Sequence, residues 1–236
     1  MADREANPAR ILRIRPTAAA AREPVDDPHY LPADPADLLH ADPSRRSPVR
    51  FESAGLSLAG HWYRPPGLAM DARTPGIVMC GPFGSVKEQT LPHYAERFAA
   101  VGYSVLTFDP RCFGESEGEP RYHFSPDQMI EDFTNGVRFL LGRDDIDAAR
   151  VAIVGVCLGG GYALSTAARF KPIKAVVSIA GGYNIGGSFQ QYMGVDGFAA
   201  YYNRVNELVT RQYQTGEVQY IPTTARSLSA DVPVAG

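Results

Sequence analysis

The order of apolar and polar positions divides the chain at about residue 47. Residues 1–47 are rich in Ala, Pro, Arg and Asp, show no sustained apolar period, and carry prolines that interrupt helices. We expect this segment to be a disordered tail, with a short helix around 36–40 as an option. Residues 49–53 and 56–63 then alternate apolar and polar side chains on either side of a Gly55 turn, which predicts an antiparallel hairpin.

Between residues 76 and 179, short continuous apolar runs alternate with amphipathic stretches. The apolar runs predict buried strands at 76–80, 104–108, 151–154 and 173–179. Helical periodicity lies between them, at 88–101, 127–141 and 158–169. This alternation predicts an α/β fold of three layers, in which a mostly parallel sheet is covered on both faces and joined by right-handed crossovers. After residue 180 the alternation stops, and one helix is expected at 196–213.

Composition narrows the classes of partner. The chain has 236 residues, and removing the tail leaves about 190 to build a core, which is sizeable but tight for a large α/β enzyme. A formal net charge of -3 and the lack of a Lys/Arg stripe argue against a nucleic-acid partner. We find neither an apolar run long enough to span a membrane nor the apolar core of a signal peptide. We therefore expect no membrane partner.

The cysteines indicate a reducing compartment. Cys80, Cys112 and Cys157 are odd in number, far apart and without C-x-x-C spacing, so neither a disulfide framework nor a zinc cage is expected. This usage predicts a cytoplasmic protein without a metal site.

The strongest chemical motif is the string G-V-C-L-G-G-G at residues 155–161, where an apolar strand meets a small-residue helix. It is the cysteine form of the nucleophile elbow, in which Cys157 occupies a strained strand-to-helix turn. Gly155 and Gly159 would let the backbones pass closely, and the Leu158 N–H would face a developing oxyanion. The helix N-terminus would favour the thiolate. The alternative is a structural cysteine beside a Gly-rich packing turn.

These elements and the string G-V-C-L-G-G-G-Y resemble the α/β-hydrolases, in particular the dienelactone hydrolases and their broader relatives in polyketide pathways. The resemblance covers about 51–182 and includes the strings G-P-F-G-S-V-K-E-Q at 81–89 and F-D-P-R-C-F-G-E-S at 108–116. It implies an ester, lactone or thioester substrate, no cofactor, and a covalent acyl-enzyme on Cys157. Dienelactone hydrolases carry a glutamate where this chain has Gly81, and this departure argues against dienelactone itself as the substrate.

Further candidate residues follow the other strands. Pro82 has no N–H, so Phe83 is the expected second oxyanion donor, with Gly84 behind it. Arg111 lies in a charged group just past a buried strand, where it would either contact a polar substrate or belong to a hydrogen-bonded loop. Tyr192 belongs to an aromatic set in 183–220 that would either line a pocket or pack between helix and sheet.

The catalytic partners of Cys157 are not evident. In the fold that the chain resembles, the acid and the histidine follow the nucleophile. All five histidines precede Cys157, at positions 29, 40, 61, 93 and 123, and no strand of the earlier kind follows Ile179. Three explanations stay open: the sequence is the N-terminal portion of a longer hydrolase, His123 or another distant group is the base, or the chain is an inactive relative that binds a ligand or partner.

The chain is accordingly divided into a tail over 1–47, an α/β-hydrolase core over 48–182, and a cap-like helical insertion with a loose end over 183–236. The C-terminal strands of the fold are expected to be missing, which would leave an exposed, association-prone face and allow a homo-oligomer.

Overall fold

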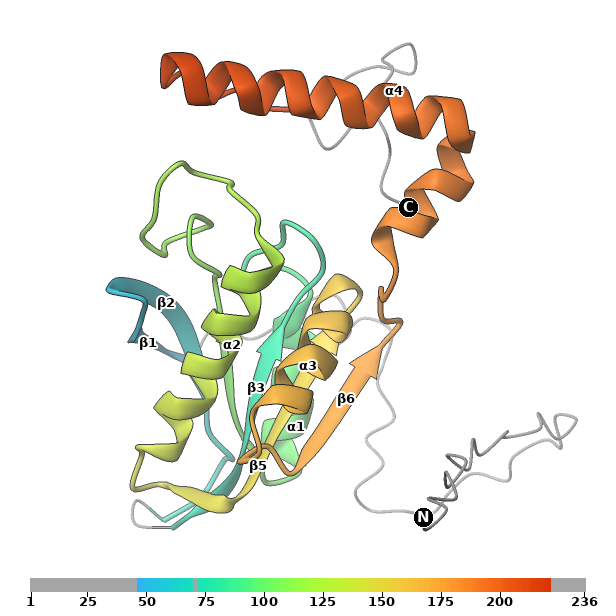
Figure 1. Cartoon of the computed structure of the whole chain (residues 1–236). Coiled ribbons are helices and arrows are strands. Elements are labelled where there is room, and N and C mark those ends of the chain that lie inside the picture. Colours follow the sequence, from blue (N-terminus) through green and yellow to red (C-terminus); the bar gives the residue numbers. More distant parts are fainter. Residues whose placement is uncertain (1–45, 70–71, 222–236) are drawn as a thin grey trace, which may run out of the picture.

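The computed structural model describes residues 46–69 and 72–221, so most of the expected tail and the optional helix at 36–40 lie outside the described residues. A six-stranded mixed sheet with the strand order β1-β2-β4-β3-β5-β6 forms the centre (Figure 1). Its strands are β1 (Arg46–Ser53), β2 (Leu56–Tyr63), β3 (Thr74–Cys80), β4 (Ser104–Phe108), β5 (Ile146–Val156) and β6 (Ala175–Ile179). Strands β4, β3, β5 and β6 are parallel, and β1 and β2 form the predicted antiparallel hairpin.

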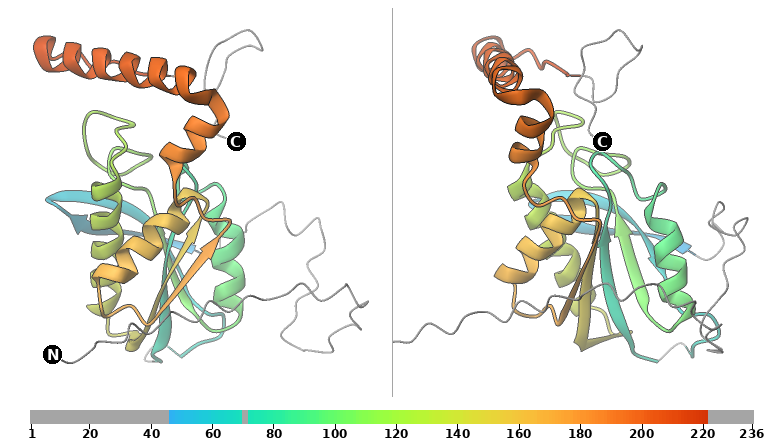
Figure 2. Two further views of the ribbon diagram at one scale, coloured as in Figure 1. Left: turned by 45° about the vertical axis from the view of Figure 1, so that its right-hand side comes forward. Right: turned by 90° about the vertical axis from the view of Figure 1, so that its right-hand side faces the viewer.

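Helices cover both faces of the sheet. Helix α1 (Leu91–Ala100) packs on one face, and α2 (Pro126–Leu141) and α3 (Leu158–Arg169) pack on the other (Figure 2). Two hydrophobic clusters fill the spaces between the layers, one around Phe133 and Val78 and one around Met79 and Leu91. The predicted three-layer α/β fold with an N-terminal hairpin is confirmed.

Helix α1 begins at Leu91, three residues after the start that the apolar pattern predicts. Pro92 lies in its first turn, where the missing N–H costs nothing, whereas the same residue inside a longer helix would interrupt it. The preceding residues form a turn instead, in which the Val86 N–H donates to the Gln89 side chain at 3.2 Å. The loop between β3 and α1 is therefore longer than expected.

Helix α4 (Ile185–Thr215) also differs from the sequence prediction, because it begins eleven residues earlier than the expected start at 196. The Asn184 side chain caps its first turn by accepting from the Gly187 N–H at 3.0 Å. Gly194 has φ 73° and ψ 170°, which divides α4 into two segments. Gly187 and Gly194 weaken the apolar periodicity of the first segment, so the sequence pattern predicts only the second segment. No helix in the described ranges is long and apolar enough to cross a membrane.

Strand β6 corrects another expectation. Its continuous apolar sequence, A-V-V-S-I, predicted a strand buried on both faces, but none of its five residues is buried. Strand β5 pairs with one side of β6, and no strand among the described residues pairs with the other. Its sequence also lacks the charges by which edge strands usually oppose pairing with other chains.

The exposed edge generates a prediction. Val177 is 44% exposed, so we expect Val177→Lys to change the free energy of unfolding little while it reduces self-association. Sedimentation velocity over a concentration series would measure the association, and urea unfolding would measure stability. Gln214→Lys, which adds the same charge at an exposed position of α4, is the matched control and should leave association unchanged. A loss of about 2 kcal/mol in Val177→Lys would contradict the exposure of this side chain.

Candidate active site

Cys157 lies at the junction of β5 and α3 in a strained backbone conformation. Its φ of 55° and ψ of -125° place it in a region that non-glycine residues rarely adopt. Hydrogen bonds hold both sides of the residue: its N–H donates to the Ile179 carbonyl at 2.9 Å, and its carbonyl accepts from Gly160 at 2.9 Å and from Gly182 at 3.0 Å. The turn is therefore held by the first turn of α3, by the last residue of β6 and by the loop between β6 and α4.

The elbow glycines occupy places where a side chain would collide with backbone. A Cβ on Gly155 would lie 2.0 Å from the Gly159 carbonyl oxygen. A Cβ on Gly159 would lie 2.6 Å from the carbonyl oxygens of Cys80 and Gly81. These close approaches place the start of α3 against the loop that follows β3, so that loop is in contact with the elbow.

The three thiols have different surroundings. Cys80 and Cys112 are buried, and burial raises the pKa of each thiol. Cys157 is only partly buried. Because the thiolate is the reactive form, Cys80 and Cys112 should react slowly with electrophiles, and a fast reaction of this chain can be traced to Cys157.

The two candidate oxyanion donors belong to the two loops that meet here. Leu158 is the first residue of α3, so its N–H has no partner within the helix. The Phe83 N–H makes no hydrogen bond to any other described residue, while Pro82 accepts from the N–H of Ser85 at 3.2 Å and from its hydroxyl at 2.9 Å. Both amides thus have free hydrogen-bonding capacity beside the elbow.

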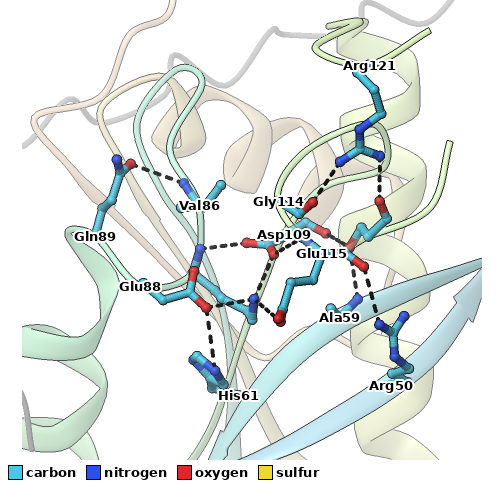
Figure 3. Close-up of polar contacts among 12 residues, drawn as sticks. Arg50, Ala59, His61, Val86, Glu88, Gln89, Asp109, Gly114, Glu115 and Arg121 are labelled. Atoms are coloured by element: carbon cyan, nitrogen blue, oxygen red, sulfur yellow. Dashed lines mark hydrogen bonds and ion pairs between the residues drawn. The ribbon is translucent and has the colours of Figure 1, made fainter. Parts of the chain in front are cut away.

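A buried ion pair fixes the loop that carries Phe83 (Figure 3). The Lys87 side chain is only 1% exposed, and its Nζ lies 2.8 Å from Oδ2 of Asp109, whose side chain is fully buried. Glu88 and Glu115 complete the surroundings of this ammonium group at 2.7 and 2.8 Å. Desolvation lowers the pKa of Lys87, but the hydrogen bonds that its ammonium group donates to these carboxylates outweigh this effect and raise the pKa above its ordinary value, so Lys87 stays a cation.

Asp109 connects this loop to the one that follows β4. Its carboxylate accepts from the Lys87 N–H at 2.7 Å and from the Glu115 N–H at 2.9 Å, while its carbonyl accepts from the Ser116 hydroxyl at 2.6 Å. A Cβ at Gly114 would lie 2.2 Å from the same carboxylate. Lys87 was not among the predicted site residues, although it is the one charged residue in the string from 81 to 87.

Arg111, for which the sequence left open a substrate contact or a hydrogen-bonded loop, has internal partners. Its guanidinium binds Asp132 and donates to Glu131 at 2.8 Å and to the Ser53 hydroxyl at 3.1 Å. The Ser53 hydroxyl in turn donates to Asp132 at 2.6 Å. The structure therefore places Arg111 in a network that ties β1 to α2, which corresponds to the hydrogen-bonded loop considered as the alternative.

The remaining candidates lie in separate places. Tyr192 is exposed on the first segment of α4. His61 is buried on β2, with its Nε2 3.7 Å from Glu88, while His123 is exposed in the loop after β4. Within the described residues, no histidine makes a hydrogen bond to Cys157. The structure thus brings Cys157, Leu158 and the Phe83 loop together, and no histidine of the described ranges is hydrogen-bonded to the thiol.

A mostly parallel sheet between helical layers, with a strained strand-to-helix turn after β5, is typical of an α/β-hydrolase fold. The chain belongs to the family described as serine aminopeptidase, S33, whose model matches residues 74–229, more than half of the chain. It is 43% identical over 124 residues to the uncharacterized protein PA2218 of Pseudomonas aeruginosa, covering 52% of this chain and 33% of that protein. The crystal structure of that protein matches with a TM-score of 0.71 and 30% identity, covering 82% of this chain and 62% of that one.

Two fungal relatives carry functional names. The chain is 38% identical over 125 residues to thiohydrolase aneE of Aspergillus aculeatus, covering 53% of this chain and 38% of the relative. It is 32% identical over 136 residues to polyketide transferase grgF of a Penicillium species, covering 57% of this chain and 45% of the relative. The crystal structure of α/β-hydrolase GrgF matches with a TM-score of 0.60 and 26% identity, covering 77% of this chain and 59% of that one. The chain spans less than half the length of these curated relatives.

The buried ion pair generates a stability prediction. Lys87→Met should cost about 3–5 kcal/mol of unfolding free energy, because it leaves the Asp109 carboxylate buried without its cation. Glu115→Gln is the matched control: it changes a carboxylate of the same network that is 71% exposed, and its effect should be much smaller. Urea unfolding of both variants measures the difference. Equal stabilities of Lys87→Met and Glu115→Gln would contradict the role given to the buried pair.

His61 generates a prediction about pH. Burial, followed by the charge of Arg46, holds the pKa of His61 below its ordinary value. The unfolded chain therefore takes up this proton first as the pH falls, so the free energy of unfolding should decrease below about pH 6.5. His61→Gln should reduce this dependence between pH 7 and 5.5, as measured by urea unfolding. His123→Gln, at an exposed position, is the control, and an unchanged slope in His61→Gln would reject the assignment.

Proposed function

We propose that this chain carries the nucleophile of an acyl-processing hydrolase or transferase, and that Cys157 accepts the acyl group of an ester, lactone or thioester. The observation that carries the proposal is the strained backbone of Cys157 at the β5–α3 junction, with Gly155 and Gly159 packed against neighbouring backbone. The names of the relatives, a thiohydrolase and a polyketide transferase, support acyl chemistry and include a polyketide-derived acyl group among the candidates.

The proposed step is acyl transfer to sulfur. The thiolate of Cys157 forms a bond to the acyl carbon, and the electron pair moves onto the carbonyl oxygen. The N–H groups of Leu158 and Phe83 would stabilise this oxyanion. When the carbonyl re-forms, the bond to the leaving oxygen or sulfur breaks. The leaving group departs with the electron pair and takes up a proton from water. Water or another acceptor would then remove the acyl group from Cys157.

The experiment measures acylation of the thiol. We expect a p-nitrophenyl ester or an activated thioester to add one acyl group to the chain, located on Cys157 by peptide mass spectrometry. No described histidine bonds to the thiol, so the expected result is stoichiometric acylation, with slow release in place of rapid turnover. Iodoacetamide should likewise alkylate Cys157 faster than Cys80 or Cys112, because those two thiols are buried.

Cys157→Ala is the control for both reactions, and Cys112→Ala is the matched variant that removes a buried thiol. Acylation that survives in Cys157→Ala, or alkylation of Cys157 no faster than that of the buried thiols, would reject the nucleophile.

The alternative function is a catalytically inactive binding or interaction module on the same fold. The observation that favours it is the position of every histidine of the chain before Cys157. Ligand binding that is identical in the wild type and in Cys157→Ala, together with no acylation of either protein, would support this alternative.

A further inference from the structure

Six aromatic side chains form a continuous group at the carboxyl edge of the sheet. Phe124 lies at its centre, with ring centroids 4.8 Å from Phe83, 5.8 Å from Tyr162 and 6.2 Å from Phe113. Tyr122 continues the group, at 6.0 Å from Phe113 and 6.4 Å from Tyr220. We call this group the aromatic wall: Phe83, Phe113, Tyr122, Phe124, Tyr162 and Tyr220.

The aromatic wall is assembled beside the elbow from segments far apart in the sequence. Phe83 follows β3, and the Gly81 carbonyl of that same loop lies against Gly159 of the elbow. Tyr162 lies on α3, one turn and a half after Cys157. The loop after β4 supplies Phe113, Tyr122 and Phe124 at the edge of the sheet from which α4 rises (Figure 1), and the segment after α4 supplies Tyr220. The wall and the thiol therefore share one edge of the fold.

Phe113 is buried, and Phe124 and Tyr162 are partly buried against the core, but the other three rings are more exposed than core packing produces. Phe83, Tyr122 and Tyr220 are 41%, 69% and 61% exposed, although each contacts a neighbouring ring. Exposed aromatic rings beside a functional centre are typical of a ligand site. The space enclosed beneath the loop, between Pro82, Phe113 and Phe124, is only about 10 Å³, about enough for one water molecule. A ligand would therefore lie across the exposed ring faces, not behind them.

The chemistry of the aromatic wall selects the class of ligand. Phenyl and phenol rings present π faces and hydroxyl groups, and none of the six side chains is acidic or basic. Flat π systems gain from offset stacking and edge contacts that a puckered saturated ring of equal size cannot make. Burial also raises the pKa of Tyr162 to about 12, so its hydroxyl stays protonated at neutral pH.

We propose that the aromatic wall is the acyl-chain subsite beside Cys157 and binds a flat, uncharged, unsaturated acyl group of the aryl or polyenyl class. The proposal rests on the proposed function, because the thiol must be the acyl acceptor for the wall to hold an acyl chain. Stacking places the chain on Phe83 and Tyr122 and leaves its carbonyl carbon toward the elbow.

The test measures binding without covalent chemistry. In Cys157→Ala, we expect 2-acetylnaphthalene, an unreactive aryl ketone, to bind at least tenfold more tightly than 2-acetyldecalin, its saturated counterpart, by isothermal titration calorimetry. Phe83→Leu and Tyr122→Leu, each added to Cys157→Ala, should weaken binding of the aryl ketone about tenfold. Both positions are exposed, so both variants should fold. Tyr213→Leu is the matched control, because it removes a 92% exposed aromatic ring of α4 outside the wall.

Equal affinity for the two ketones, no binding of either, or an equal effect of Tyr213→Leu would each overturn the aromatic wall. The outcome is independent of the acylation experiment. Aryl binding without acylation of Cys157 in the wild type would retain the wall as a ligand site and reject only the proposed acyl chemistry. Acylation of Cys157 without a preference for the aryl ketone would retain the proposed acyl chemistry and reject the aromatic wall as its subsite.

Discussion

The close approach of bare backbone at the elbow is the constraint on which the rest of the site depends. Gly155 and Gly159 must both lack a Cβ, because the carbonyls of Cys80, Gly81 and Gly159 occupy that space. This contact sets the distance between the end of β3 and the start of α3. It thereby brings the Phe83 loop and the Leu158 amide to the same place. The strained φ of Cys157 is the local result of passing from strand to helix under this restriction.

A second constraint acts on the loops themselves. In addition to their ring contacts, the loops after β3 and β4 are joined by a buried lysine and a buried aspartate. Because the Asp109 carboxylate also binds two backbone N–H groups, the loops after β3 and β4 cannot move independently without leaving a charge unpaired. The rings of Phe83 and Phe124, one from each loop, are thereby held against each other.

The sheet and its helices could be predicted from the sequence because buried parallel strands are continuous apolar runs and amphipathic helices are periodic. The limits of α1 and of the first α4 segment could not, since Pro92 and Asn184 act through local geometry that periodicity does not register. The exposure of β6 depends on which neighbours a strand has, and an apolar run contains no such information.

Among site residues, the elbow was recognisable because its spacing is local. The pairing of Lys87 with Asp109 and that of Arg111 with Asp132 join residues about twenty positions apart, and only the topology brings them together. Charged residues at a strand end were therefore visible as candidates, but their partners were not. The same holds for the aromatic wall, whose six members come from four segments.

Helix α4 has no buried residue of its own, and the residues on either side of it contact the rest of the fold. At one end, Gly182 bonds to the carbonyl of Cys157, and at the other, Tyr220 contacts Tyr122. The segment from 195 to 215 lies between these two contacts and is roughly 31 Å long at 1.5 Å per residue. Each residue added or removed would rotate the far end by about 100° as well as lengthen or shorten it. The position of Tyr220 relative to Tyr122 therefore depends on the number of residues in this helix.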